Sequence, residues 1–270
     1  MVVLNKIIEF LETFAPFELA EDYDNVGLLV GDKSKEIKKI MITLDVDEKV
    51  IEDAKKQGCD LIVSHHPLIF SSIKKVVTDD SCTKNIISLI KNDIALVSVH
   101  TNFDSTESGL CDVFLDKITK TKNRTPIDCG RAGRIADMEK ETVLSEILFN
   151  IKKEFGISSL KYVGDANKTI SKIAVCNGGG ADFIYSAKEL GADLYVSGDF
   201  KYHHARFAYE NDIALVEVPH YNAEIIFCDY LNKMMSNEYR EKLEIVSTTE
   251  NKDVWNILGW YIPGGYNGTY

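Results

Sequence analysis

The sequence predicts an α/β protein built from two related halves, and two observations carry this prediction. Short apolar runs rich in β-branched residues alternate with amphipathic segments, as expected for strands that are buried on both faces and joined by helices. The same order of runs then occurs a second time along the chain. We therefore expect ligands to bind where the carboxyl ends of equivalent strands meet.

The expected elements begin with an amphipathic helix. Its apolar positions follow helical spacing: Leu4, Ile7, Ile8, Leu11 and Phe14. Lys6, Glu9 and Glu12 interrupt the segment, which argues against a signal peptide or a membrane span. Strands are expected at KIMITLDV, DLIVS, IALVSVH, KIAVC, DLYVS and IALVEV, with helices between several of them, such as VDEKVIEDAKKQG and DFIYSAKELG.

The internal repeat has a nearly constant spacing. KIMITLDVD (39–47) matches KIAVCNGGG (172–180), and GCDLIVSHHP (58–67) matches GADLYVSGDF (191–200), each 133 residues later. NDIALVSVH and NDIALVEVPH match 119 residues apart, because the first copy has an extra segment, SSIKKVVTDDSCTK. Apolar strands can match by chance, but the shared order and spacing favour two related halves. We place the joint near the polar stretch NRTPIDCGRAGR and expect one domain of residues 1–126 with 237–270 and another of 127–236.

Composition limits the classes of function. A chain of 270 residues with 45% hydrophobic content can bury a sizeable core. The formal net charge of −11 argues against binding nucleic acid or anionic membranes by electrostatic attraction. Six scattered cysteines without a C-x-x-C pair indicate free thiols in a reducing cytoplasm.

All six histidines follow four of the expected strands. His65 and His66 follow DLIVS, and His203 and His204 come shortly after its partner strand, beyond Asp199. The third strands are followed by HTNFD, with His100 and Asp104, and by HYNAE, with His220 and Glu224. Imidazole and carboxylate groups are common metal ligands and proton carriers, so these strand ends predict a metal site.

Each group also has an ordinary structural interpretation. His65 and His66 could simply end a strand, Asp104 and Asp199 could cap helices, and His203 or His204 could be solvated. The glycines at 178–180 could form a tight turn or bind an anion. The combination favours metal, because three histidines with two carboxylates exceed the three protein ligands of a simple catalytic zinc site. They suit two neighbouring cations that share a carboxylate.

The ordered motifs resemble those of the GTP cyclohydrolase 1 type 2 homologues, also called Nif-three-like dinuclear metal-centre proteins. The resemblance rests on DNVGLLVG (24–31), SHHPLIF (64–70), HTNFD (100–104), SGDFKYHHA (197–205) and HYNAE (220–224). It implies two interlocked α/β domains in the short form of the family, commonly assembled as a ring-like homohexamer, with two divalent cations in the cleft. Tyr23 and His204 depart from the residues frequent in the family.

The resemblance also implies roles for individual residues. His66 and Asp104 would bind one cation, His65 and His220 the other, and Glu224 would bridge both. Water would attack C8 of guanine in GTP and release formate, with Asp199, His203 or His100 orienting groups or carrying protons. Lys201 and the glycines at 178–180 are candidates for holding the triphosphate.

Two other functions fit the same residues. A dinuclear site also serves phosphoester hydrolysis, and a protein that only carries metal or acts as a scaffold needs no reaction at all. Imidazole and carboxylate ligands without thiolate are compatible with zinc, manganese, iron, cobalt or nickel.

Overall fold

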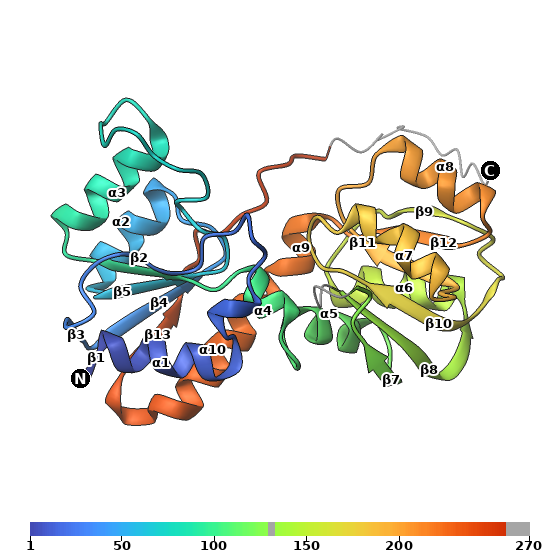
Figure 1. The fold of residues 1–270 in the computed structure, drawn as a ribbon, viewed down its shortest axis with the longest axis horizontal. Coiled ribbons are helices and arrows are strands. Elements are labelled where there is room, and N and C mark those ends of the chain that lie inside the picture. The colour runs from blue at the N-terminus through green and yellow to red at the C-terminus, as the bar shows by residue number, and fades with distance from the viewer. Residues whose placement is uncertain (129–132, 258–270) are drawn as a thin grey trace, which may run out of the picture.

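The computed structural model describes residues 1–128 and 133–257, so part of the expected joint and the end of the C-terminal tail lie outside it. Two sheets lie at opposite ends of the long axis, and short helices occupy the region between them (Figure 1). The expected α/β class is confirmed. No helix among the described residues has both the length and the apolar character needed to cross a membrane.

The first sheet has five strands in the order β13-β4-β5-β6-β2, and only β2 is antiparallel to its neighbour. Helices α2 and α3 cover one face, and α1 and α10 cover the other. The strands are β2 (Gly27–Val30), β4 (Lys39–Thr43), β5 (Leu61–Ser64), β6 (Ala95–Ser98) and β13 (Glu244–Ser247). The helices are α1 (Leu4–Phe14), α2 (Glu48–Gln57), α3 (Ser81–Lys91) and α10 (Ile226–Tyr239).

The second sheet has six strands in the order β7-β8-β10-β11-β12-β9, with a parallel centre of β10, β11 and β12. Helices α5 and α6 cover one face, and α7 and α8 cover the other. The strands are β7 (Thr121–Thr125), β8 (Arg134–Val143), β9 (Lys161–Val163), β10 (Thr169–Val175), β11 (Leu194–Ser197) and β12 (Ala214–Glu217). The helices are α5 (Leu110–Ile118), α6 (Leu144–Glu154), α7 (Ile184–Glu189) and α8 (Tyr202–Glu210).

Several short elements complete the chain. A two-residue antiparallel pair joins β1 (Val2–Val3) to β3 (Glu36–Ile37). Two five-residue helices, α4 (Thr101–Ser105) and α9 (His220–Glu224), follow β6 and β12. The 3-10 turns are η1 (Phe17–Leu19), η2 (Ala181–Phe183) and η3 (Arg240–Lys242).

The two halves repeat each other in detail as well as in order. The Asp60 carboxylate accepts hydrogen bonds from the backbone N–H groups of residues 38 and 39, and the Asp193 carboxylate accepts them from residues 171 and 172. Both bonds recur 133 residues later, at the spacing of the sequence repeat. Gly58 follows helix α2 of the first copy and Gly191 follows helix α7 of the second, again 133 residues later, and each has positive φ. The structure therefore supports two related halves.

Two helices are exchanged between the halves. After β6 the chain crosses through α4, and Phe114, Leu115 and Ile118 of α5 enter the core of the six-stranded sheet. After β12 it crosses back through α9, and Phe227 and Leu231 of α10 enter the core of the five-stranded sheet. Each half thus needs a helix from the other to cover its sheet.

The expected domain boundaries fall within this exchange. The boundary at 126 and 127 follows β7, which already pairs with β8 in the second sheet. The boundary at 236 and 237 falls inside α10, which packs as a whole on the first sheet. Periodicity shows that α10 has an apolar face, but not which sheet that face covers.

We predict that Leu231→Ala lowers the free energy of unfolding by about 2–5 kcal/mol, because it leaves a cavity between the exchanged helix and the five-stranded sheet. Leu231 is fully buried there. Urea unfolding followed by circular dichroism measures the loss. The exposed neighbour Lys233→Ala is the control, and equal stabilities of the two variants would contradict the packing of α10.

Candidate metal centre

The crossing segments bring one set of polar side chains together between the sheets. His65 and His66 follow β5, Asp104 lies on α4, and His220 and Glu224 lie on α9. We call these five residues the histidine–carboxylate centre. Asp104 and Glu224 come from the two short helices through which the chain passes from one half to the other, so the centre depends on the exchange.

Glu224 lies in the middle of this centre. Its side chain is almost fully buried, and its Oε2 lies 2.9 Å from His66 Nε2 and 2.9 Å from His220 Nε2. Its Oε1 lies 3.9 Å from His65 Nε2, which is also 3.7 Å from Asp104 Oδ1. The two oxygens of one carboxylate therefore face different histidines.

His65 has the ring nitrogen that a metal ligand requires. Its Nδ1 lies 2.9 Å from the carbonyl oxygen of Val99, which can only accept, so Nδ1 carries the proton. The other nitrogen, Nε2, then has a free lone pair in the neutral ring. In the part of the chain that the structure describes, His65 Nε2 is buried and has no hydrogen-bond partner. Because it faces two carboxylate oxygens, a cation between them would satisfy Nε2 and bind both oxygens.

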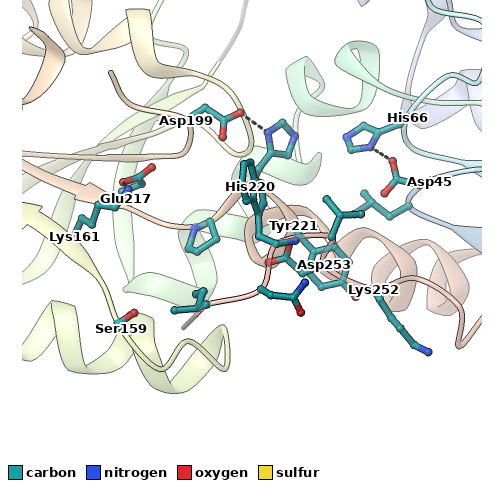
Figure 2. Close-up of a pocket in the computed structure, with 16 residues that line it drawn as sticks. Asp45, His66, Ser159, Lys161, Asp199, Glu217, His220, Tyr221, Lys252 and Asp253 are labelled. Atoms are coloured by element: carbon teal, nitrogen blue, oxygen red, sulfur yellow. Dashed lines mark hydrogen bonds and ion pairs between the residues drawn. The ribbon is translucent and has the colours of Figure 1, made fainter. Parts of the chain in front are cut away.

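Carboxylates orient the other imidazoles in the same way. Asp45 lies 2.7 Å from His66 Nδ1, and Asp199 lies 2.8 Å from His220 Nδ1, on opposite sides of the cavity in Figure 2. Such contacts fix the ring and direct Nε2 toward the centre. His100 is held similarly, with Nδ1 2.9 Å from Asp24, and its ring packs against that of His65.

Burial and hydrogen bonds shift the pKa values of the centre in different directions. Burial lowers the pKa of His65 to about 3, which keeps this imidazole neutral. Burial also opposes protonation of His66 and His220, but hydrogen bonds to carboxylates outweigh it and raise their pKa values to about 10 and about 9. Burial acts to raise the pKa of Glu224, yet hydrogen bonds from those two imidazoles hold it well below its usual range. Burial and the charge of Glu224 raise the pKa of Asp104 to about 7.

A second group of possible metal ligands contains a histidine, His204, whose hydrogen bonds are the opposite of those of His65. Asp182, His203 and His204 lie close together, with His204 Nε2 3.0 Å from Asp182 and 3.1 Å from His203 Nε2. However, His204 Nδ1 accepts a hydrogen bond from the backbone N–H of Lys201. The proton of neutral His204 is therefore on Nε2, where it donates to a neighbour and leaves no lone pair for a metal.

The glycines at 178–180 form a turn against the centre. Gly178 has φ +59°, and a Cβ on it would overlap Glu224 Oε1 and lie 3.0 Å from His220 Nε2. A Cβ on Gly179 would meet no atom nearer than 3.4 Å. Gly178 is thus needed for the close approach of the backbone to Glu224.

Two cavities meet at the centre. One, of about 620 Å³, is lined by four residues of the centre, His66, Asp104, His220 and Glu224, together with His100. Its aromatic residues include Tyr23, Phe70 and Phe183. The other, of about 650 Å³, shares Asp45, His66 and His220 with the first and extends to the C-terminal segment. Solutes can therefore approach the His66–His220 pair through either cavity.

The structure gathers most of the residues selected from the sequence. All five expected metal ligands are in the centre, and Asp199 contacts His220. His203 is not among the described residues that line either cavity. Asp24, Asp45 and Asn177 also contact these residues and were not predicted from the sequence. Asp45 and Asn177 follow β4 and β10, the first strands of the two repeats, so the same strand-end rule could have found them.

The model of the protein family Duf34/NIF3 (NGG1p interacting factor 3) matches residues 2–253 of this chain. The chain belongs to this family. A Clostridium perfringens protein named "GTP cyclohydrolase 1 type 2 homolog" is 39% identical over 260 residues, covering 94% of this chain and 99% of its own length.

Solved structures show the same relationship. Reduced HcgD from Methanocaldococcus jannaschii is 34% identical with a TM-score of 0.80, covering 91% of this chain and 97% of its own. Staphylococcus aureus protein SA1388 is 26% identical with a TM-score of 0.85, covering 95% of this chain and 99% of its own. The Duf34/NIF3 fold thus extends over nearly the whole chain.

We predict that Gly178→Ala weakens binding of added zinc by about tenfold or more, because the new Cβ displaces Glu224. Competition with a chromogenic chelator measures the affinity. Gly179→Ala is the matched control and should bind as the wild type does. Wild-type affinity in Gly178→Ala would show that zinc does not need Glu224 where the structure places it.

Proposed function

We propose that this Duf34/NIF3 protein is a metal-dependent hydrolase that holds two divalent cations bridged by Glu224. The observation that carries the proposal is the buried lone pair of His65 Nε2, which faces oxygens of Asp104 and Glu224 at 3.7 Å and 3.9 Å. A tetrahedral ion bound at about 2.0–2.1 Å holds its ligand atoms about 3.4 Å apart, so only a small contraction is needed.

The geometry favours a particular division of the ligands. His65 and Asp104 would hold one cation with Glu224 Oε1, and His66 and His220 would hold the other with Oε2. The resemblance instead pairs His66 with Asp104 and His65 with His220. Both divisions use the same five residues and the same bridge.

The roles of the protein groups follow from their contacts. When bound, two divalent cations lower the pKa of water and polarise a substrate oxygen. Asp45 holds the ring of His66, and Asp199 holds the ring of His220. Glu224 contacts His66 and His220 through Oε2 and faces His65 through Oε1, so it links the two proposed ligand sets. His100, held by Asp24, faces the cavity and is our candidate for proton transfer. His203 would act there only after moving from its contact with His204.

The name shared by several relatives supplies the first reaction to test. Attack of one water on C8 of guanine in GTP would open the imidazole ring to a formamide, and a second water would hydrolyse the formamide and release formate. Phosphoester hydrolysis and metal handling without turnover are the competing functions, because the same centre serves all three. The ring-shaped homohexamer and the cytoplasmic location stay predictions, as does the choice among zinc, manganese, iron, cobalt and nickel.

We predict about two transition-metal ions per chain in wild-type protein purified without a histidine tag, measured by elemental mass spectrometry. His65→Ala and Glu224→Gln should lose metal because each removes a ligand, whereas His203→Ala should keep it. A wild type without metal after anaerobic reconstitution would overturn the proposed centre.

The division of the ligands gives a sharper version of this experiment. In our assignment, the double variant His66→Ala/His220→Ala removes both histidine ligands of one cation. The other cation should stay bound, at about one ion per chain. In the division implied by the resemblance, it removes a ligand from each cation and both are weakened. The double variant His65→Ala/Asp104→Asn should likewise keep one ion, and loss of both ions from either double variant would contradict our assignment.

We predict metal-dependent release of formate from GTP that is abolished in Glu224→Gln, because the bridge between the cations is lost. Coupled formate dehydrogenase and phosphate assays separate the possible reactions. Phosphate release or phosphodiester cleavage instead of formate would favour a phosphoesterase. No turnover, together with readily exchanged metal, would favour metal handling.

A further inference from the structure

Asn177 contacts both carboxylates of the histidine–carboxylate centre without being one of its expected ligands. The residue follows β10 and is 4% exposed. Its Nδ2 lies 2.9 Å from Asp104 Oδ1 and 3.2 Å from Glu224 Oε1. These are the same two oxygens that face His65 Nε2. One amide group therefore donates to the two oxygens that we assign to one cation.

A thiol fixes the direction of this amide. Cys111 Sγ, on α5, donates to Asn177 Oδ1 at 2.7 Å. If the amide were turned over, its oxygen would face two carboxylate oxygens and its NH2 group would face a weak acceptor, sulfur. The thiol and the carboxylates thus select the same orientation.

We propose that Asn177, oriented by Cys111, is a positioning residue that sets the separation of Asp104 and Glu224 for the cation on the His65 side. The inference rests on the proposed dinuclear centre. Two neighbouring carboxylates, one buried and one half-buried, repel each other, and the two N–H groups of one amide offset part of this repulsion while fixing each carboxylate. The amide nitrogen has no lone pair to offer, and the amide oxygen points to Cys111, so Asn177 acts through its neighbours and does not bind the ion.

Asn177→Leu removes the hydrogen bonds at similar volume. The fold already accepts leucine at the equivalent position of the first repeat, where Leu44 lies. Zinc titrated against a chelator should show one site per chain weakened about 10- to 100-fold, the effect typical of groups that orient metal ligands. The site formed by His66 and His220 should keep its affinity.

Cys111 supplies a second, independent pair of variants. Cys111→Ala removes the donor that orients the amide and should weaken the same site, whereas Cys111→Ser keeps a donor and should restore it. Cys59→Ala is the control, because Cys59 is a buried thiol in a different core cluster. Thermal unfolding of each variant in excess chelator measures the stability of the metal-free protein separately.

The outcomes distinguish this inference from the proposed function. Weakening of one site in Asn177→Leu and Cys111→Ala, with rescue in Cys111→Ser, supports the positioning role. Wild-type zinc affinity in the Asn177 and Cys111→Ala variants overturns it while leaving the dinuclear centre intact. A loss of stability in chelator without a change in affinity shows a structural role only and also overturns it. Absence of zinc binding by the wild type overturns the proposed function itself.

Discussion

The exchange of α5 and α10 between the two sheets is the constraint on which the rest of the structure depends. Each helix buries apolar side chains against a sheet built mainly from the other half, so neither half has a complete core alone. The chain must cross between the sheets twice, and α4 and α9 are the crossing segments. Because Asp104 and Glu224 lie on these segments, the packing that joins the halves also brings the carboxylates to the histidines that follow β5.

The sequence predicted the central strands, the repeat and the residues that gather at the strand ends, because apolar periodicity and strand ends are local features. Residues such as Asp45 and Asn177 were harder to recognise, since aspartate and asparagine after a strand are common. The exchange of α10 could not be predicted, because Leu231 has the same apolar spacing whichever sheet it covers. Whether a histidine can bind metal also depends on partners that are distant in sequence. The carbonyl oxygen of Val99, for example, holds the Nδ1 proton of His65 and leaves Nε2 free.

His65 and His204 illustrate why residue type alone does not identify a ligand. Both are buried, and both have carboxylates nearby. A carbonyl oxygen takes the Nδ1 proton of His65 and frees Nε2, whereas a backbone N–H occupies Nδ1 of His204 and leaves the proton on Nε2. The backbone around each ring therefore decides whether it presents a lone pair or a proton.

The repeat also explains how two similar halves can contribute different residues to one centre. His65 and His66 of the first copy correspond to Gly198 and Asp199 of the second, and Asp45 corresponds to Gly178. Two identical half-length chains would have to place the same side chain on both sides, including a carboxylate where Gly178 leaves room for Glu224. Fusion into one polypeptide removes that requirement. It lets one copy supply the histidine pair while the other supplies the space and the aspartate that supports His220.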